Sequence, residues 1–85
     1  MSGEVIRTIN IGAIDTAPFG ITTDEKYLWW VGKTNTLIVQ MDKAGNVIRT
    51  IDVSGIDIQP TGISTDGKYL WWVGYTNKII VQMNK

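Results

Sequence analysis

The sequence predicts an all-β fold made of two copies of one four-stranded unit. The segment from Gly3 to Lys43 aligns without a gap with the segment from Gly45 to Lys85, and 27 of the 41 aligned pairs are identical at an offset of 42 residues. Each copy divides into short runs rich in β-branched and aromatic residues, separated by turn-forming residues. The apolar residues do not follow the spacing of three and four that indicates a helix.

The first copy contains four runs that we expect to be strands. In chain order they cover Val5–Ile11, Gly20–Thr23, Tyr27–Gly32 and Leu37–Met41. Turn chemistry separates them, because the breaks hold Pro18, the pair Asp24-Glu25, the pair Thr34-Asn35 and the polar segment 42–46. The second copy repeats the pattern, with expected strands over 47–53, 62–65, 69–74 and 79–83.

The middle runs of each copy indicate a sheet that is covered on both faces. Leu28 to Val31 and Leu37 to Val39 are apolar without a break, whereas a half-exposed strand alternates apolar and polar residues. Two consecutive tryptophans place one indole on each face, where we expect them to pack between neighbouring sheets rather than to stack on a ligand. A four-stranded sheet between copies of itself is a blade of a β-propeller, and a repeat of 42 residues is typical of such arrays.

The motif PTGISTDGKYLWWV, residues 60–73, and the closing segment GNVIRTI, residues 45–51, resemble the YVTN-type β-propeller repeat. The resemblance covers the whole chain twice. It departs at Trp29-Trp30 and Trp71-Trp72, where the family usually has Tyr-Val, and at Glu25, where it usually has Gly. The resemblance implies a blade order, from the central channel outward, of Gly20–Thr23, Tyr27–Gly32, Leu37–Met41 and then the outermost strand, to which Val5–Ile11 corresponds.

That order predicts that the ring closes between chains. The outermost-type strand 5–11 comes first and has no inner strands of its own, while Ile79–Met83 is a third strand with no fourth. We therefore expect residues 3–43 to form one blade repeat whose strand 5–11 is donated to the last blade of a neighbouring chain, and residues 45–85 to form the other repeat. This Velcro closure assigns the following residues to the assembly interface: Val5, Ile6, Ile9, Ile11, Ile79, Ile80, Val81, Met83, Trp29, Trp30, Trp71 and Trp72.

Two blades per chain allow rings of six, eight or ten blades. We expect eight blades from four chains, a homotetramer, with six blades from three chains as the next choice. The 84 residues that follow Met1 make two whole periods. A chain whose length is a whole number of repeat periods is typical of an engineered protein or of a recently amplified gene.

The composition argues against catalysis and against several classes of partner. The chain has no histidine and no cysteine, which removes the common catalytic triads, thiol chemistry and the usual zinc sites. It has no glycine-rich phosphate loop, so we expect neither enzymatic activity nor a cofactor. Eight basic residues balance eight acidic ones without clustering, and the apolar runs are short, which predicts no nucleic acid partner, no membrane and a cytoplasmic protein.

Two functions remain open from the sequence. The first is a structural block whose activity is self-assembly, and the second is a ligand-binding propeller with a polar or cation site at the channel mouth. Asp15 and Asp57 occupy matching positions, and in a closed ring they would form a crown of carboxylates able to hold a hard cation. The competing interpretation, which we favour, is that each aspartate caps a turn, and we expect the same structural role for Asp24, Asp66, Asn35 and Asn77.

Overall fold

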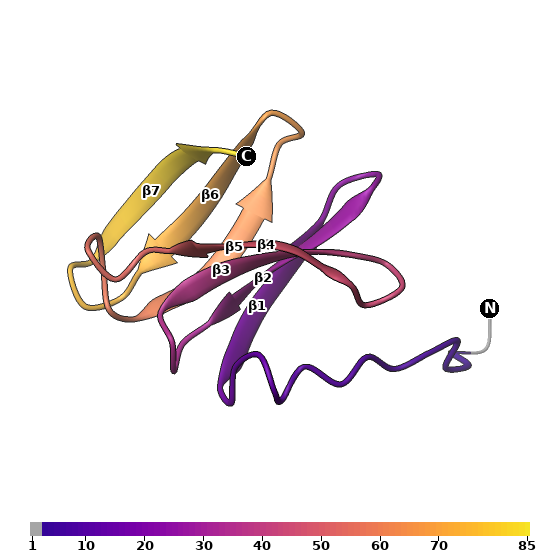
Figure 1. Cartoon of the computed structure of the whole chain (residues 1–85). Coiled ribbons are helices and arrows are strands. Elements are labelled where there is room, and N and C mark those ends of the chain that lie inside the picture. The colour runs from indigo at the N-terminus through magenta and orange to yellow at the C-terminus, as the bar shows by residue number, and fades with distance from the viewer. Residues whose placement is uncertain (1–2) are drawn as a thin grey trace.

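The computed structural model describes residues 3–85, which form seven strands in two antiparallel sheets (Figure 1). The first sheet has the order β1-β2-β3-β4 and the second the order β5-β6-β7. The strands are β1 (Pro18–Thr23), β2 (Tyr27–Gly32), β3 (Leu37–Asp42), β4 (Val47–Asp52), β5 (Pro60–Thr65), β6 (Tyr69–Gly74) and β7 (Ile79–Asn84). The all-β prediction is confirmed, and the expected inner strands are found with small extensions at their ends.

Each sheet is a meander, because short turns join strands that are neighbours both in sequence and in space. The turn between β2 and β3 contains Thr36 at φ 58°, and the matching turn between β6 and β7 contains Lys78 at φ 56°. Both residues lie in the left-handed region that few side chains adopt. The two turns therefore have the same strained geometry although their residues differ.

The two sheets pack face to face around one core. Trp29, Ile38 and Val53 come from the first sheet and the loop after it, and Leu70 and Trp72 come from the second. Tyr27, Ile51, Ile63, Val81 and Met83 surround this cluster. The sheets approach closely at their inner strands, where a Cβ on Gly20 of β1 would lie 2.6 Å from the carbonyl oxygen of Thr61 in β5, so that only glycine fits.

The opposite face of the first sheet is covered by the chain itself. Trp30, Val39 and Met41 form a second buried cluster, and Ile9, Ile11 and Ile14 of the N-terminal segment pack against it. Two consecutive tryptophans thus point to opposite faces of β2, as the strand period requires. The prediction that this sheet is covered on both faces is confirmed for the first sheet.

The N-terminal segment differs from the sequence prediction. Residues 5–11 were expected to form a strand, but within this chain they have no regular secondary structure (Figure 1), although Ile9 and Ile11 pack against the first sheet. Val5 and Ile6 are 77% and 88% exposed. The physical reason is that a strand needs a hydrogen-bonded neighbour, and the described chain gives this segment none. Its expected donation to another chain stays a prediction.

Within residues 3–85, no helix is long and apolar enough to cross a membrane.

Candidate functional site

Asp15 and Asp57 hold equivalent turns ahead of the inner strands. Asp15 is 2% exposed, and its carboxylate accepts hydrogen bonds from the backbone N–H of Ala17 at 2.8 Å, Thr34 at 3.2 Å and Asn35 at 2.8 Å. Burial raises the pKa of Asp15, but these bonds outweigh it and hold the pKa below its usual value. The carboxylate of Asp15 therefore joins the loop that precedes β1 to the turn that follows β2.

The glycine that closes each long strand makes room for this carboxylate. A Cβ at Gly32 would lie 2.6 Å from the carboxyl carbon of Asp15, and a Cβ at Gly74 would lie 2.7 Å from that of Asp57. Asp57 binds the N–H groups of Gln59, Thr76 and Asn77 in the same way. Both aspartates cap backbone, one of the two roles that the sequence allowed. No cluster of three or more potential metal-ligating side chains occurs among residues 3–85.

Asp24 and Asp66 hold the hairpins that precede the tryptophan strands. Asp24 accepts hydrogen bonds from the N–H groups of Lys26 at 2.9 Å and Tyr27 at 2.8 Å, and from the indole Nε1 of Trp29 at 3.1 Å. Asp66 accepts the three equivalent bonds at 2.9, 2.8 and 2.9 Å. The predicted turn role of both residues is confirmed, and the bond to the indole is an additional one that positions each tryptophan.

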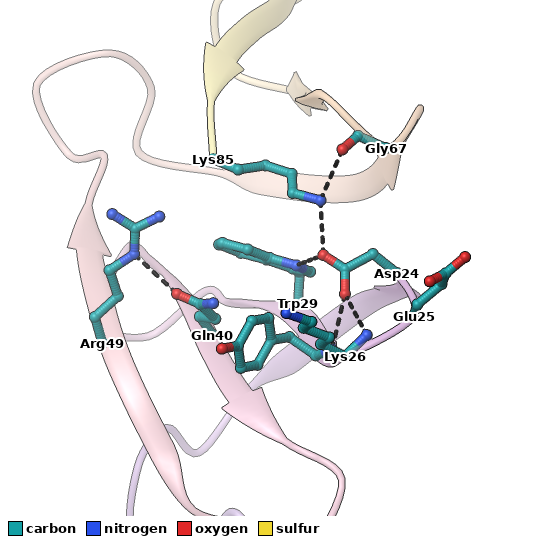
Figure 2. A pocket seen from close by; sticks show the side chains of 9 residues that line it. Asp24, Glu25, Lys26, Trp29, Gln40, Arg49, Gly67 and Lys85 are labelled. Carbon is teal, nitrogen blue, oxygen red and sulfur yellow. Dashed lines mark hydrogen bonds and ion pairs between the residues drawn. The ribbon is translucent and has the colours of Figure 1, made fainter.

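One contact distinguishes the two hairpins. Lys85, at the end of the second sheet, places its Nζ 2.7 Å from Asp24 Oδ2 and 3.1 Å from the carbonyl oxygen of Gly67 (Figure 2). Burial raises the pKa of Asp24, but the ammonium of Lys85 and the hydrogen bonds from Tyr27 and Trp29 outweigh it and lower the pKa strongly. The carboxylate of Asp66 has no lysine partner within residues 3–85.

A cavity of about 530 Å³ opens between the sheets beside this ion pair (Figure 2). Arg49 of β4 forms part of its wall, with its Nε 2.9 Å from Gln40 Oε1 and its guanidinium 5.6 Å from the ring centre of Trp29. Gln40 and Lys85 also line it. Lys85 directly follows β7, which has a neighbouring strand on one edge only.

The second sheet leaves one apolar face open. Trp71 is 37% exposed, Val73 41% and Ile80 74%, whereas their counterparts Trp29, Val31 and Ile38 are at most 1% exposed. A shallow cavity of about 270 Å³ lies over this open face. Contiguous apolar exposure of this kind is typical of an interaction site.

The first sheet has an apolar groove on the face that is turned away from the second sheet. Its volume is about 330 Å³, and the N-terminal residues Ile9 and Ile11 form one wall. Trp30 and Met41 form the floor, and Phe19, which is 45% exposed, lies at the inner rim. The molecule therefore has two apolar surfaces on opposite sides, one on each sheet.

The structure places only some of the predicted assembly residues on these two surfaces. Trp71, Ile79 and Ile80 are exposed on the second sheet, and Ile9 and Ile11 lie over the groove of the first. Trp29, Trp30 and Trp72 are buried in the two clusters, Val81 and Met83 pack against the core between the sheets, and Val5 and Ile6 project into solvent. The sequence reasoning missed Lys43 and Lys85, although a lysine recurring at one repeat period was the signal that pointed to them.

No family model matches the chain, and no curated protein matches it. The contacts described above therefore carry the functional conclusion by themselves.

Proposed function

We propose that the chain is a structural building block that assembles head to tail with copies of itself into a closed β-propeller ring, in which each sheet is one blade. One observation carries the proposal. Trp29, Val31 and Ile38, which are buried in the first sheet, recur one repeat later as Trp71, Val73 and Ile80, which the second sheet leaves open.

The packing inside the chain supplies the geometry for the contact between chains. The first sheet presents Trp29 and Ile38, and the second covers them with its Leu70 and Trp72 face. The equivalent covering face in the first sheet is that of Leu28 and Trp30. A second copy that repeats the internal packing would thus place this face over Trp71 and Ile80. The contact is heterologous, because two different surfaces meet.

The position of the N-terminal segment supports the same arrangement. The amide groups of Ile14 and Asp15 donate to the carbonyl oxygen of Ile11 at 2.9 and 3.1 Å, and those of Ile56 and Asp57 donate to Val53 at the same distances. Val53 packs against the second sheet, and its counterpart Ile11 packs against the first. The N-terminal segment therefore packs on the first sheet in the same way as the end of β4 and the loop after it pack on the second sheet.

β4 is the outermost strand of the first sheet, so the segment would serve as an outermost strand of the preceding copy. In the first sheet, the amide of Val53 donates to the carbonyl oxygen of Thr36 at 3.0 Å. The equivalent bond would join the amide of Ile11 to the carbonyl oxygen of Lys78 in another copy. Thr36 and Lys78 share the left-handed conformation that aims this carbonyl group. Strand addition to the open edge of β7 would then complete four strands in the second blade.

A repeated heterologous contact must close into a ring or grow into a fibre. We expect closure with eight blades from four chains, and six blades from three chains is the next choice. The activity so proposed is structural and involves no catalytic step.

Native mass spectrometry of the 85-residue chain tests this function, with four times the chain mass as the expected result. The variant Ile80→Asp places a charge at the centre of the proposed contact, so it should shift the protein to monomer. Ile58→Asp is the matched control, because Ile58 is 60% exposed and its counterpart is the polar Thr16, and it should leave the assembly intact. A wild-type protein that stays monomeric at high concentration would overturn the proposal.

A further inference from the structure

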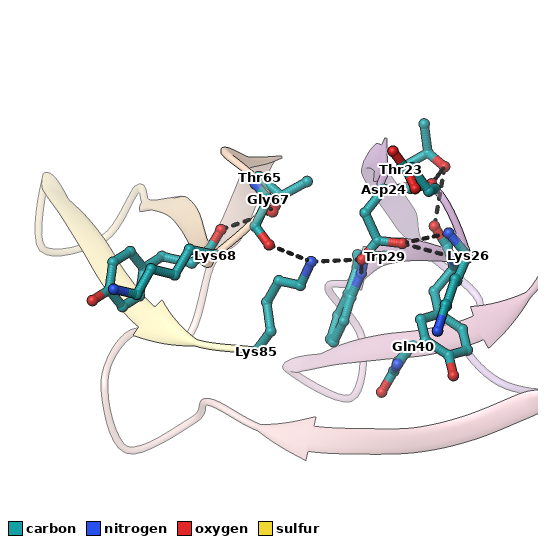
Figure 3. Close-up of polar contacts among 12 residues, drawn as sticks. Thr23, Asp24, Lys26, Trp29, Gln40, Thr65, Gly67, Lys68 and Lys85 are labelled. Atoms are coloured by element: carbon teal, nitrogen blue, oxygen red, sulfur yellow. Dashed lines mark hydrogen bonds and ion pairs between the residues drawn. The ribbon is translucent and has the colours of Figure 1, made fainter.

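Lys85 links the two sheets of the chain through a single ammonium group. Its Nζ donates to the carbonyl oxygen of Gly67 in its own sheet and to the carboxylate of Asp24 in the other (Figure 3). The two side chains are 21% and 13% exposed, so the pair is largely shielded from water. Asp24 is held in place for this contact by three further donors, namely two backbone amides and the indole of Trp29.

Both halves of this arrangement recur at one repeat period, but they do not meet. Lys43 is the counterpart of Lys85, and its Nζ donates to the carbonyl oxygen of Glu25 at 3.1 Å, as Lys85 does to Gly67. Asp66 is the counterpart of Asp24 and is held by its own three donors. Hydrogen bonds from the backbone of Tyr69, from the indole of Trp71 and from the backbone of Lys68 lower the pKa of Asp66 to about 2, so the group is an anion at neutral pH. Within residues 3–85 the ammonium of Lys43 contacts no carboxylate.

We infer that Lys43 of one copy binds Asp66 of the preceding copy, and that this ion pair sets the direction and register of assembly. The inference rests on the proposed head-to-tail contact. In that contact the first sheet of one copy takes the place that the second sheet has inside the chain. Lys43 then approaches Asp66 as Lys85 approaches Asp24, with the ammonium shared between a carbonyl oxygen of its own chain and a carboxylate of the neighbour.

The proposed ion pair contributes more to the choice of one assembly register than to the strength of association. Removing an ammonium and a carboxylate from water offsets much of their attraction, so the net gain from a shielded pair is modest. Two like charges at the same place are strongly unfavourable, because neither can be solvated there. Apolar faces alone tolerate sliding, whereas a single charged contact at each junction favours one register.

A double-mutant cycle with conservative variants measures the contact directly. Lys43→Met should weaken association at each junction about tenfold when Asp66 is present. In the Asp66→Asn background, the Lys43→Met change should have no further effect, because its partner is neutral. Lys33→Met is the matched control, since its counterpart Tyr75 is uncharged, and it should assemble as the wild type does. Association is followed by analytical ultracentrifugation, and circular dichroism verifies that each variant is folded.

Charge reversal then tests direction. Lys43→Asp alone and Asp66→Lys alone place like charges at every junction, so each should remain monomeric at concentrations where the wild type is assembled. An equimolar mixture should assemble, because alternating copies meet with opposite charges at every junction. Alternation closes only with an even number of chains, so the mixture should give a complex with two copies of each variant.

The outcomes separate this inference from the proposed function. If the wild type assembles and Lys43→Met assembles equally well, the ion pair is overturned and the ring stands. If the wild type is monomeric under all conditions, both are overturned. Should Asp66→Lys fail to fold, because Asp66 also holds its hairpin, the cycle with Asp66→Asn decides the question without it.

Discussion

Strands β2 and β6 have the same sequence, Tyr-Leu-Trp-Trp-Val-Gly, and two different environments. In β2 the last four residues are buried, whereas in β6 exposed and buried residues alternate. The alternation in β6 reflects one covered face, and the continuous burial in β2 reflects two. The same strand sequence is therefore covered on both faces in the first sheet and on one face in the second.

The neighbouring strands extend the comparison. β3 is buried over most of its length between two neighbours, while the equivalent β7 is an edge strand with exposed Ile79 and Ile80. Edge strands that are apolar and unprotected are ready to pair with another strand. Within residues 3–85, the first sheet therefore has a fourth strand that the second sheet lacks.

Removal of residues 3–11 should have the largest effect, because it would open the Trp30 face of β2 and make the first sheet incomplete as well. Ile9 and Ile11 leave the cluster of Trp30 and Met41, and the proposed fourth strand of the neighbour is lost. We expect an unfolded or insoluble protein, measured by circular dichroism and sedimentation. A soluble, folded variant with the wild-type assembly mass would contradict strand donation, and a shorter deletion that stops at Glu4 is the control.

Replacing Trp29 or Trp71 by alanine should lower the free energy of unfolding by similar amounts only in the assembly. Inside the chain Trp29 is buried, so Trp29→Ala should lower the free energy of unfolding by about 3–5 kcal/mol at any protein concentration. Trp71→Ala should cost a similar amount when the ring is formed and much less in dilute monomer. The measurement is denaturant unfolding at a range of protein concentrations. In thermal unfolding, the melting temperature of the wild type should also rise with protein concentration. Equal losses for both variants in a verified monomer would argue against this account.

Acid should produce the smallest effect and should distinguish the two hairpins. The pKa values of Asp15, Asp24, Asp57 and Asp66 are lowered in the folded chain, so their stabilisation is complete above the ordinary value of 3.8 and is lost as the pH falls towards the folded values. The free energy of unfolding should be flat near neutral pH and decline below about pH 4. Asp24→Asn should flatten this decline more than Asp66→Asn in dilute monomer, because only Asp24 has a lysine partner there. Identical profiles would contradict the role given to Lys85.

Much of the fold could be predicted because it depends on local chemistry. The apolar runs and turn residues located β2 and β6 at their observed bounds, and the double tryptophan indicated two covered faces. The start of β1 was placed two residues late, at Gly20 rather than Pro18, because proline was taken as a break although it can begin a strand at a sheet edge. The assembly surface was predicted only as a set of apolar positions, without the lysine that joins the sheets.

The sequence by itself determined the repeat, the strands and the turns, since each depends on residues within a few positions of one another. It also placed Asp15, Asp24 and their counterparts in the turns that they hold. Only the tertiary structure decided which copy of a repeated residue is buried, because burial depends on what lies across the sheet. Lys85 reaches Asp24 across 61 residues of chain, whereas the equivalent Lys43 reaches no carboxylate within the described residues. Identical sequence cannot distinguish these positions, and only the packing of one sheet against another does so.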